Sequence, residues 1–91
     1  MIKVKRTASA GTDSASDAII TVAPAEGRSI TLTSTVEGLF GDAIRAAVEK
    51  TLDELGVTDC AVRIQDRGAL DYVLRARTEA ALRRAGEEET C

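Results

Sequence analysis

The chain has 91 residues, enough for one small domain, and its 15 acidic and 12 basic side chains give a net charge of −3. This acidic balance, with only two aromatic residues and no long apolar run, argues against nucleic acid and against a membrane as partners. The absence of histidine removes the commonest general acid–base group and the mixed Cys/His zinc sites. We therefore expect neither a stand-alone enzyme nor a metal site, although catalysis by carboxylates remains an alternative.

The N-terminal residues predict little regular structure. Ile2 and Val4 alternate with lysines, which permits a short edge strand, and no apolar signal-peptide region follows, so the expected location is the cytoplasm. Residues 6–16 lack periodicity and predict a flexible loop. Its stretch AGTDSASD, Ala10–Asp17, offers two serine hydroxyls and two carboxylates. Composition alone is compatible with a solvated leader or with a place where a mobile group is attached.

Two strands are expected next. Ala18–Ala23 is short and β-branched and stops at Pro24, and Ser29–Ser34 alternates apolar residues with threonine. Gly27 lies between them and can adopt a positive φ in a turn. We therefore predict that the two strands pair as an antiparallel hairpin.

The following segment predicts a helix of about five turns. Ser34 and Glu37 have the spacing of a capping box, and Gly56 is suited to end the helix in the left-handed conformation. Apolar residues recur at spacings of three and four along one stripe: Val36, Leu39, Phe40, Ala43, Ile44, Ala47, Val48, Leu52 and Leu55.

A third strand and a second helix complete the expected fold. Cys60–Gln65 alternates, with Cys60 interpreted as a small buried residue, and Asp66 is a candidate N-cap for a helix over residues 67–85. The acidic tail, residues 86–91, is expected to be disordered. The order β-β-α-β-α predicts a two-layer α+β domain, with two helices packed on one face of a small, largely antiparallel sheet.

Two features are candidates for contact with other molecules. Two glycines within the GLFGDAI stretch, Gly38–Ile44, are costly in a helix and favour close approach of another chain, although tolerated glycines near the first turns remain an alternative. Five arginines on the second helix form either a solvated face or a surface for an acidic partner or a phosphate: Arg67, Arg75, Arg77, Arg83 and Arg84.

Two segments resemble one known family. FGDAIRAAVEKTL, Phe40–Leu52, and RGALDYVLRARTEAALRRA, Arg67–Ala85, are similar to the acyl carrier protein, or gamma subunit, of citrate lyase. The likeness extends from about Ala10 to Ala85, and the GALD and LRAR motifs of the second helix match in order and register.

The resemblance implies a non-catalytic carrier subunit that takes part in citrate fermentation. In this family a loop serine is linked through a phosphodiester to 2'-(5''-phosphoribosyl)-3'-dephospho-CoA, which makes the carrier a phosphoprotein with a prosthetic group. The terminal thiol holds an acetyl thioester. The resemblance implies three partners. The alpha subunit exchanges acetyl for citryl, and the beta subunit cleaves the citryl thioester to oxaloacetate. A transferase attaches the prosthetic group.

The chain departs from the family pattern at the serine. The family reads acid, serine, serine or glycine, aspartate, and an ungapped alignment on Asp17 puts Ala15 at the modified position. A slip of one residue matches Asp13 and Ser14 to the acid and the serine, so we favour Ser14, with Ser16 as the second candidate. The alternatives are the carrier subunit of malonate decarboxylase and an unmodified adapter subunit.

The surface that meets the larger subunits is also a prediction. We expect Arg75 and Arg77 of the second helix and Gly41 and Asp42 of the two-glycine stretch to contact them.

Overall fold

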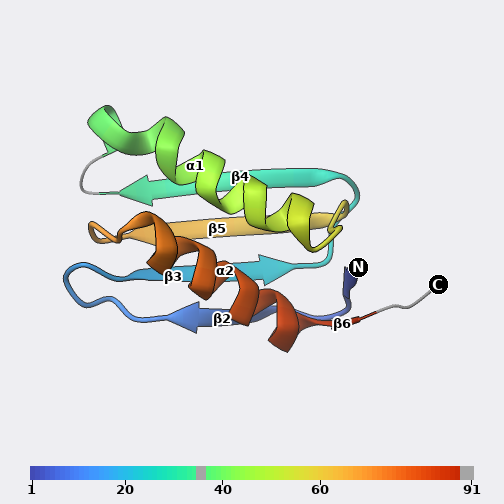
Figure 1. Ribbon diagram of the computed structural model, residues 1–91. Helices are drawn as coiled ribbons and strands as arrows, with labels where there is room; N and C mark the ends of the chain where they lie inside the picture. The colour runs from blue at the N-terminus through green and yellow to red at the C-terminus, as the bar shows by residue number, and fades with distance from the viewer. Residues whose placement is uncertain (35–36, 89–91) are drawn as a thin grey trace.

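The computed structural model describes residues 1–34 and 37–88. Two helices cover one face of a four-stranded sheet, and a short two-stranded sheet joins the ends of the chain (Figure 1). The predicted two-layer α+β class is therefore confirmed. The elements in chain order are β1 (Ile2–Val4), β2 (Ala8–Gly11), β3 (Ala18–Ala23), β4 (Arg28–Ser34), α1 (Glu37–Glu54), β5 (Cys60–Asp66), α2 (Asp71–Ala85) and β6 (Gly86–Glu88).

The predicted hairpin between β3 and β4 is wrong, because β5 lies between them in the order β2-β3-β5-β4. β5 is antiparallel to β3 and parallel to β4, the direction produced when a helix such as α1 carries the chain back between two strands. The connection 24–27 spans two strand spacings, about 10 Å, and Gly27 O accepts a 2.9 Å hydrogen bond from Cys60 N of β5. β5, with every second residue buried, takes a central position.

Part of the predicted flexible loop is a strand. Residues 8–11 form β2, which pairs antiparallel with β3 from Ala8 opposite Val22 to Gly11 opposite Ile19. Small residues have little intrinsic strand preference, but Ala10 is buried and β2 packs against α2. Of the predicted loop, residues 6–7 and 12–16 remain outside the strands, and the longer of these stretches lies between β2 and β3.

The expected disordered tail is also partly structured. Residues 86–88 form β6, antiparallel to β1, while residues 89–91 lie outside the described part of the chain. Gly86 permits this pairing, because a Cβ atom there would lie 2.3 Å from the carbonyl oxygen of Lys3. The pairing joins residues more than 80 positions apart, so no local pattern predicts it.

Helix α1 ends as predicted. Gly56 has a φ of 70°, its N–H donates to Asp53 O at 3.1 Å, and the N–H of Val57 donates to Leu52 O at 2.9 Å. These two bonds form a Schellman motif.

The apolar stripe of α1 is buried at Ile44, Ala47, Val48 and Leu52, whereas Phe40 and Ala43 are exposed. The predicted capping box pairs Ser34 with Glu37, and the side chains of residues 35–39 lie outside the described part of the structure.

Helix α2 starts later than predicted. Asp66 does not cap it: the helix begins at Asp71, with Leu70 in the N-cap position. Gly68 has a φ of 89°, which is incompatible with a helix. The carboxylate of Asp66 instead accepts hydrogen bonds from Gly68 N (3.1 Å), Ala69 N (3.0 Å) and the hydroxyl of Ser34 (2.8 Å), and so shapes the β5–α2 connection.

The core lies between the sheet and the two helices. Ile20 and Ile64 of the sheet and Leu52 and Leu82 of the helices are fully buried. Cys60 is buried as predicted, and this burial raises the pKa of its thiol. In the part of the chain that the structure describes, neither helix is long and apolar enough to cross a membrane.

Candidate functional site

The loop between β2 and β3, residues 12–17, lies at the end of the sheet where both helices begin (Figure 1). We call it the serine loop. The side chains of Ser14 and Ser16 are exposed, whereas Asp17 is buried. Among the described residues, no hydrogen bond engages either serine hydroxyl, so both hydroxyls face solvent and can be reached by another molecule.

The backbone of the serine loop is attached to the rest of the fold. Asp17 N donates to Ser14 O at 3.1 Å, which closes a β-turn, and Ser16 sits in it with a φ of 65°. Ser16 N donates to Arg67 O at 2.8 Å, and Arg67 N donates to Asp17 O at 2.9 Å. The loop thus has a defined base on the β5–α2 connection, with two hydroxyls projecting from it.

Asp17 is the main side-chain anchor of this loop. Arg77 donates to both of its carboxylate oxygens, from Nε at 3.0 Å and from Nη2 at 2.9 Å. Thr12 Oγ1 donates at 2.6 Å and Ala18 N at 2.7 Å. The bonds from Arg77, then those from Thr12 and Ala18, hold the pKa of Asp17 well below its usual range.

We expect Asp17→Asn to reduce stability at neutral pH and to flatten its decline in acid. A carboxyl with a depressed folded-state pKa stabilises the fold above its unfolded pKa of about 3.9, and this stabilisation is lost as the pH falls toward the folded value. Urea unfolding at pH 7 and pH 3 should therefore show a smaller difference in the free energy of unfolding for Asp17→Asn than for the wild type. Asp13→Asn, which removes an exposed carboxylate from the same loop, is the control. Identical pH dependence in Asp17→Asn and the wild type would contradict this role of Asp17.

A second arginine lies beside Ser14. Arg67 Nη1 contacts Asp13 Oδ1 at 3.3 Å, and both side chains are largely exposed. An exposed ion pair of this kind contributes little stability and exchanges partners readily. The Arg67 guanidinium is therefore available to other anions close to Asp13.

The four residues predicted to contact partners lie in separate places. Arg75 and Arg77 are two positions apart on α2 and so point in directions about 160° apart around the helix. Arg75 contacts both carboxylate oxygens of Glu54 at 3.2 Å, near the end of α1, whereas Arg77 holds Asp17. Gly41 and Asp42 belong to the first half of α1.

Sequence reasoning missed the pairing of Asp17 with Arg77. The available signal was the position of Arg77 near the apolar face of its helix, where an arginine requires a buried acceptor.

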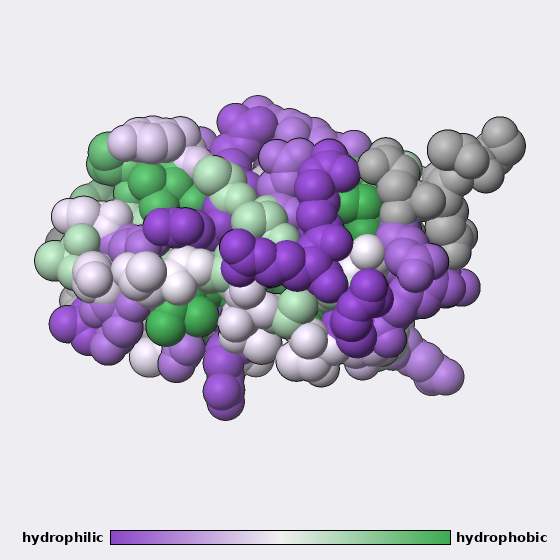
Figure 2. Space-filling model, turned by 90° about the horizontal axis from the view of Figure 1, so that it is seen from below, coloured by the Kyte–Doolittle hydropathy of each residue, from purple (hydrophilic) through white to green (hydrophobic). Residues whose placement is uncertain are grey.

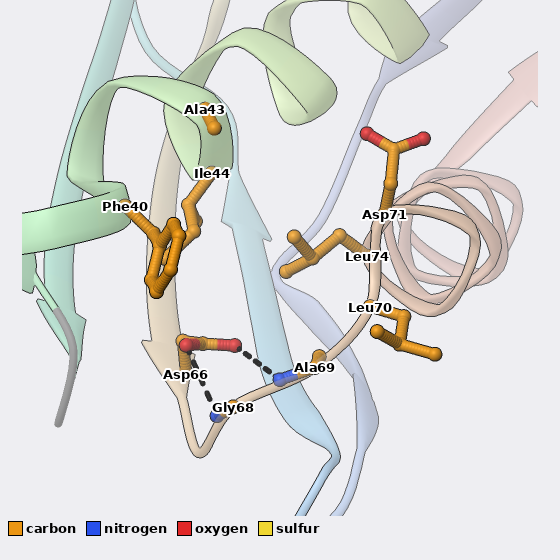
Figure 3. A pocket seen from close by; sticks show the side chains of 9 residues that line it. All are labelled: Phe40, Ala43, Ile44, Asp66, Gly68, Ala69, Leu70, Asp71 and Leu74. Atoms are coloured by element: carbon orange, nitrogen blue, oxygen red, sulfur yellow. Dashed lines mark hydrogen bonds between the residues drawn. The ribbon is translucent and has the colours of Figure 1, made fainter.

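Sequence reasoning also missed a cavity of about 370 Å³ between the first turns of the two helices. Phe40 and Ile44 of α1 line one side of it, Leu70 and Leu74 the other, and the connection at Gly68 lies between them (Figure 3).

Comparison with known proteins relates this chain to acyl carrier proteins. Residues 5–85 match the family model described as malonate decarboxylase delta subunit (MdcD). The chain is 48% identical over 91 residues to the citrate lyase acyl carrier protein of Halothermothrix orenii, covering 97% of each chain. It is 46% identical over 90 residues to that of Lacticaseibacillus casei, covering 98% of this chain and 89% of the other.

One solved structure shares the fold. A chain of a Pseudomonas malonate decarboxylase hetero-tetramer in complex with malonate superposes with a TM-score of 0.76 at 24% identity, covering 90% of this chain and 86% of the other. At this identity the likeness concerns the fold alone.

Proposed function

The chain belongs to the citrate lyase acyl carrier protein family, and from this premise we propose that its serine loop carries the arm on which the acyl group travels. The chain is a carrier subunit and not itself an enzyme. The observation that supports the loop as the attachment point is the pair of solvent-facing serine hydroxyls on an anchored turn.

The residues of the loop fit a phosphodiester-linked group. A serine hydroxyl supplies the oxygen of the ester, and Arg67 supplies a guanidinium that can balance the phosphate charge. We propose that the group is 2'-(5''-phosphoribosyl)-3'-dephospho-CoA, whose thiol holds acetyl or citryl as a thioester. The chain itself contributes the tether, which keeps the acyl group at a high effective concentration near the active sites of its partners.

Ser14 is our preferred attachment site, with Ser16 as the alternative. Ser14 follows Asp13, whose carboxylate holds the Arg67 guanidinium close to it. Ser16 is more constrained, because it occupies a left-handed backbone conformation and its N–H is bound to Arg67 O. A modifying enzyme must fit its active site around the chosen serine, which is easier at Ser14 than at the tightly held Ser16.

The intact mass of the protein tests this assignment. We expect the chain, co-expressed with its transferase, to gain the mass of the nucleotide arm, and the tryptic peptide 7–28 to carry the increase. A loaded carrier that supports citrate cleavage when mixed with citrate lyase alpha and beta subunits would separate this function from that of malonate decarboxylase, which the matching family model keeps as a second candidate. An unchanged mass would favour an adapter subunit.

We propose that the complex forms in the cytoplasm and that its alpha and beta subunits contact α1 and α2 of this chain. The proposed contact includes four residues: Arg75, Arg77, Gly41 and Asp42. Arg75 allows the cleanest test, since Arg77 also holds the serine loop. We expect Arg75→Glu to weaken co-purification with the partner subunits about tenfold, because reversing a charge at an interface creates like-charge contacts. Arg63→Glu, on the sheet face that the helices leave uncovered, is the matched control. Equal binding by both variants would remove Arg75 from the interface.

A further inference from the structure

The cavity between α1 and α2 is open to solvent and lies beside the start of both helices. Its walls are largely apolar, and its rim is formed by Phe40 and Leu70, which are 54% and 61% exposed. Figure 3 shows the Leu74 side chain pointing toward Phe40 and Ile44, whereas Leu70 lies on the side of Leu74 with its side chain turned outward. In Figure 2 most of the surface is hydrophilic and hydrophobic side chains lie mainly toward the left end, the end that carries the serine loop. Water is a poor ligand for such a lining, so an apolar occupant would be favoured.

The cavity lies next to the serine loop, because a backbone hydrogen bond joins this loop to the β5–α2 connection that lines the cavity. Its Gly68 directly follows Arg67, whose O accepts the hydrogen bond from Ser16 N. The path from Ser14 to Gly68 consists of two Cα–Cα steps to Ser16, this hydrogen bond to Arg67, and one peptide unit. Ser14 and Gly68 therefore lie at most roughly 15 Å apart. The pantetheine chain alone, equivalent to about four extended residues or ~14 Å, approaches this span, and the nucleotide adds further reach.

From this adjacency we propose that the cavity holds the uncharged pantetheine end of the carrier's own arm, with its thiol free or acetylated, between visits to the partner subunits. This inference rests on the proposed function, because it requires the arm at the serine loop. The occupant is thus a group tethered to this chain, which needs no separate binding partner to bring it to the cavity.

The charges around the cavity select which end of the arm enters. Asp66 and Asp71 both line it, so the phosphates of the nucleotide are repelled, whereas Arg67 lies on the loop side, where the phosphodiester would be. The carboxylate of Asp66 already accepts three hydrogen bonds from the protein, which leaves the apolar walls as the main contact for the thioester end. A volume of about 370 Å³ accommodates this end and excludes the complete nucleotide.

Docking in an open cavity must be weak, because the arm has to leave it to reach the active sites of the partners. A tethered group that is docked for two thirds of the time reacts with an external reagent about threefold more slowly than a free one. The cavity would therefore shield the thioester from water without trapping it.

Nuclear magnetic resonance of the loaded protein provides the test. With the arm confirmed by intact mass and acetylated at its thiol, we expect the amide signals of Ala43, Ala69 and Leu70 to shift relative to the unloaded chain. Ala43→Trp places an indole in the cavity from an exposed position and should abolish these shifts. Ala46→Trp, an exposed residue on the same helix that does not line the cavity, should retain them.

Reactivity of the arm thiol gives a second measurement. In a Cys91→Ser background, where the remaining cysteine Cys60 is buried, alkylation of the deacetylated arm should be about threefold faster in Ala43→Trp than in the wild type. Shifts confined to the serine loop, with equal alkylation rates, would overturn the cavity proposal and leave the carrier function intact. A wild-type chain that never acquires the arm would overturn both.

Discussion

Ser14→Ala is expected to abolish attachment of the arm and, with it, citrate cleavage by the reconstituted complex. Alanine has no hydroxyl from which the phosphodiester can form, so no acyl group is tethered to the carrier. Because tethering replaces an encounter between separate molecules, we expect the rate to fall by at least about three orders of magnitude. Intact mass measures the loading, and the release of oxaloacetate measures the rate.

Ser16→Ala is the matched control, since it removes a second exposed hydroxyl from the same turn. We expect this variant to be loaded and active. Both serine side chains lie outside the core, so both variants should unfold at the same urea concentration as the wild type. A loaded Ser14→Ala together with an unloaded Ser16→Ala would assign the arm to Ser16 instead.

Gly11→Ala is expected to cause the largest loss of stability among changes near the loop. A Cβ atom at this position would lie 1.7 Å from the carbonyl oxygen of Ala18, and the φ of 108° disfavours any side chain. Because the obstructing atom belongs to the backbone of β3, the β2–β3 pairing must open. We expect the free energy of unfolding to fall by at least about 3 kcal/mol, measured by urea denaturation.

Gly27→Ala separates the steric clash from the backbone conformation. Gly27 also has a positive φ, of 73°, but no atom lies within 4 Å of a Cβ built there. We expect this variant to lose only about 1 kcal/mol, the usual cost of a left-handed conformation for alanine. Similar losses for both variants would show that the close approach of Gly11 to Ala18 carries no extra energy.

Of these two glycines, Gly11 also affects the position of the serine loop. Since Ala18 follows Asp17, opening of the pairing at Gly11 displaces the carboxylate that Arg77 holds. We therefore expect Gly11→Ala to slow loading by the transferase even where the chain remains folded, whereas Gly27→Ala leaves loading unchanged.

The sequence by itself determined the elements that have a local signature. Helix α1 and its end at Gly56, strand β3 before Pro24, and the alternation of β5 all follow from residues close together in the chain. The exposed serines were also predicted, because a run of small polar residues has nothing to bury. These features depend on periodicity and backbone preference, which are properties of short segments.

Only the tertiary structure decided which segments meet. β5 separates β3 from β4, β2 forms from residues with little strand preference, and β6 pairs with β1 across nearly the whole chain. The bond between Asp17 and Arg77 likewise joins positions 60 residues apart, and the cavity exists because two helices begin at the same end of the sheet. Each of these contacts gains its free energy from burial and pairing between distant residues, and such energies leave no periodic trace in the sequence.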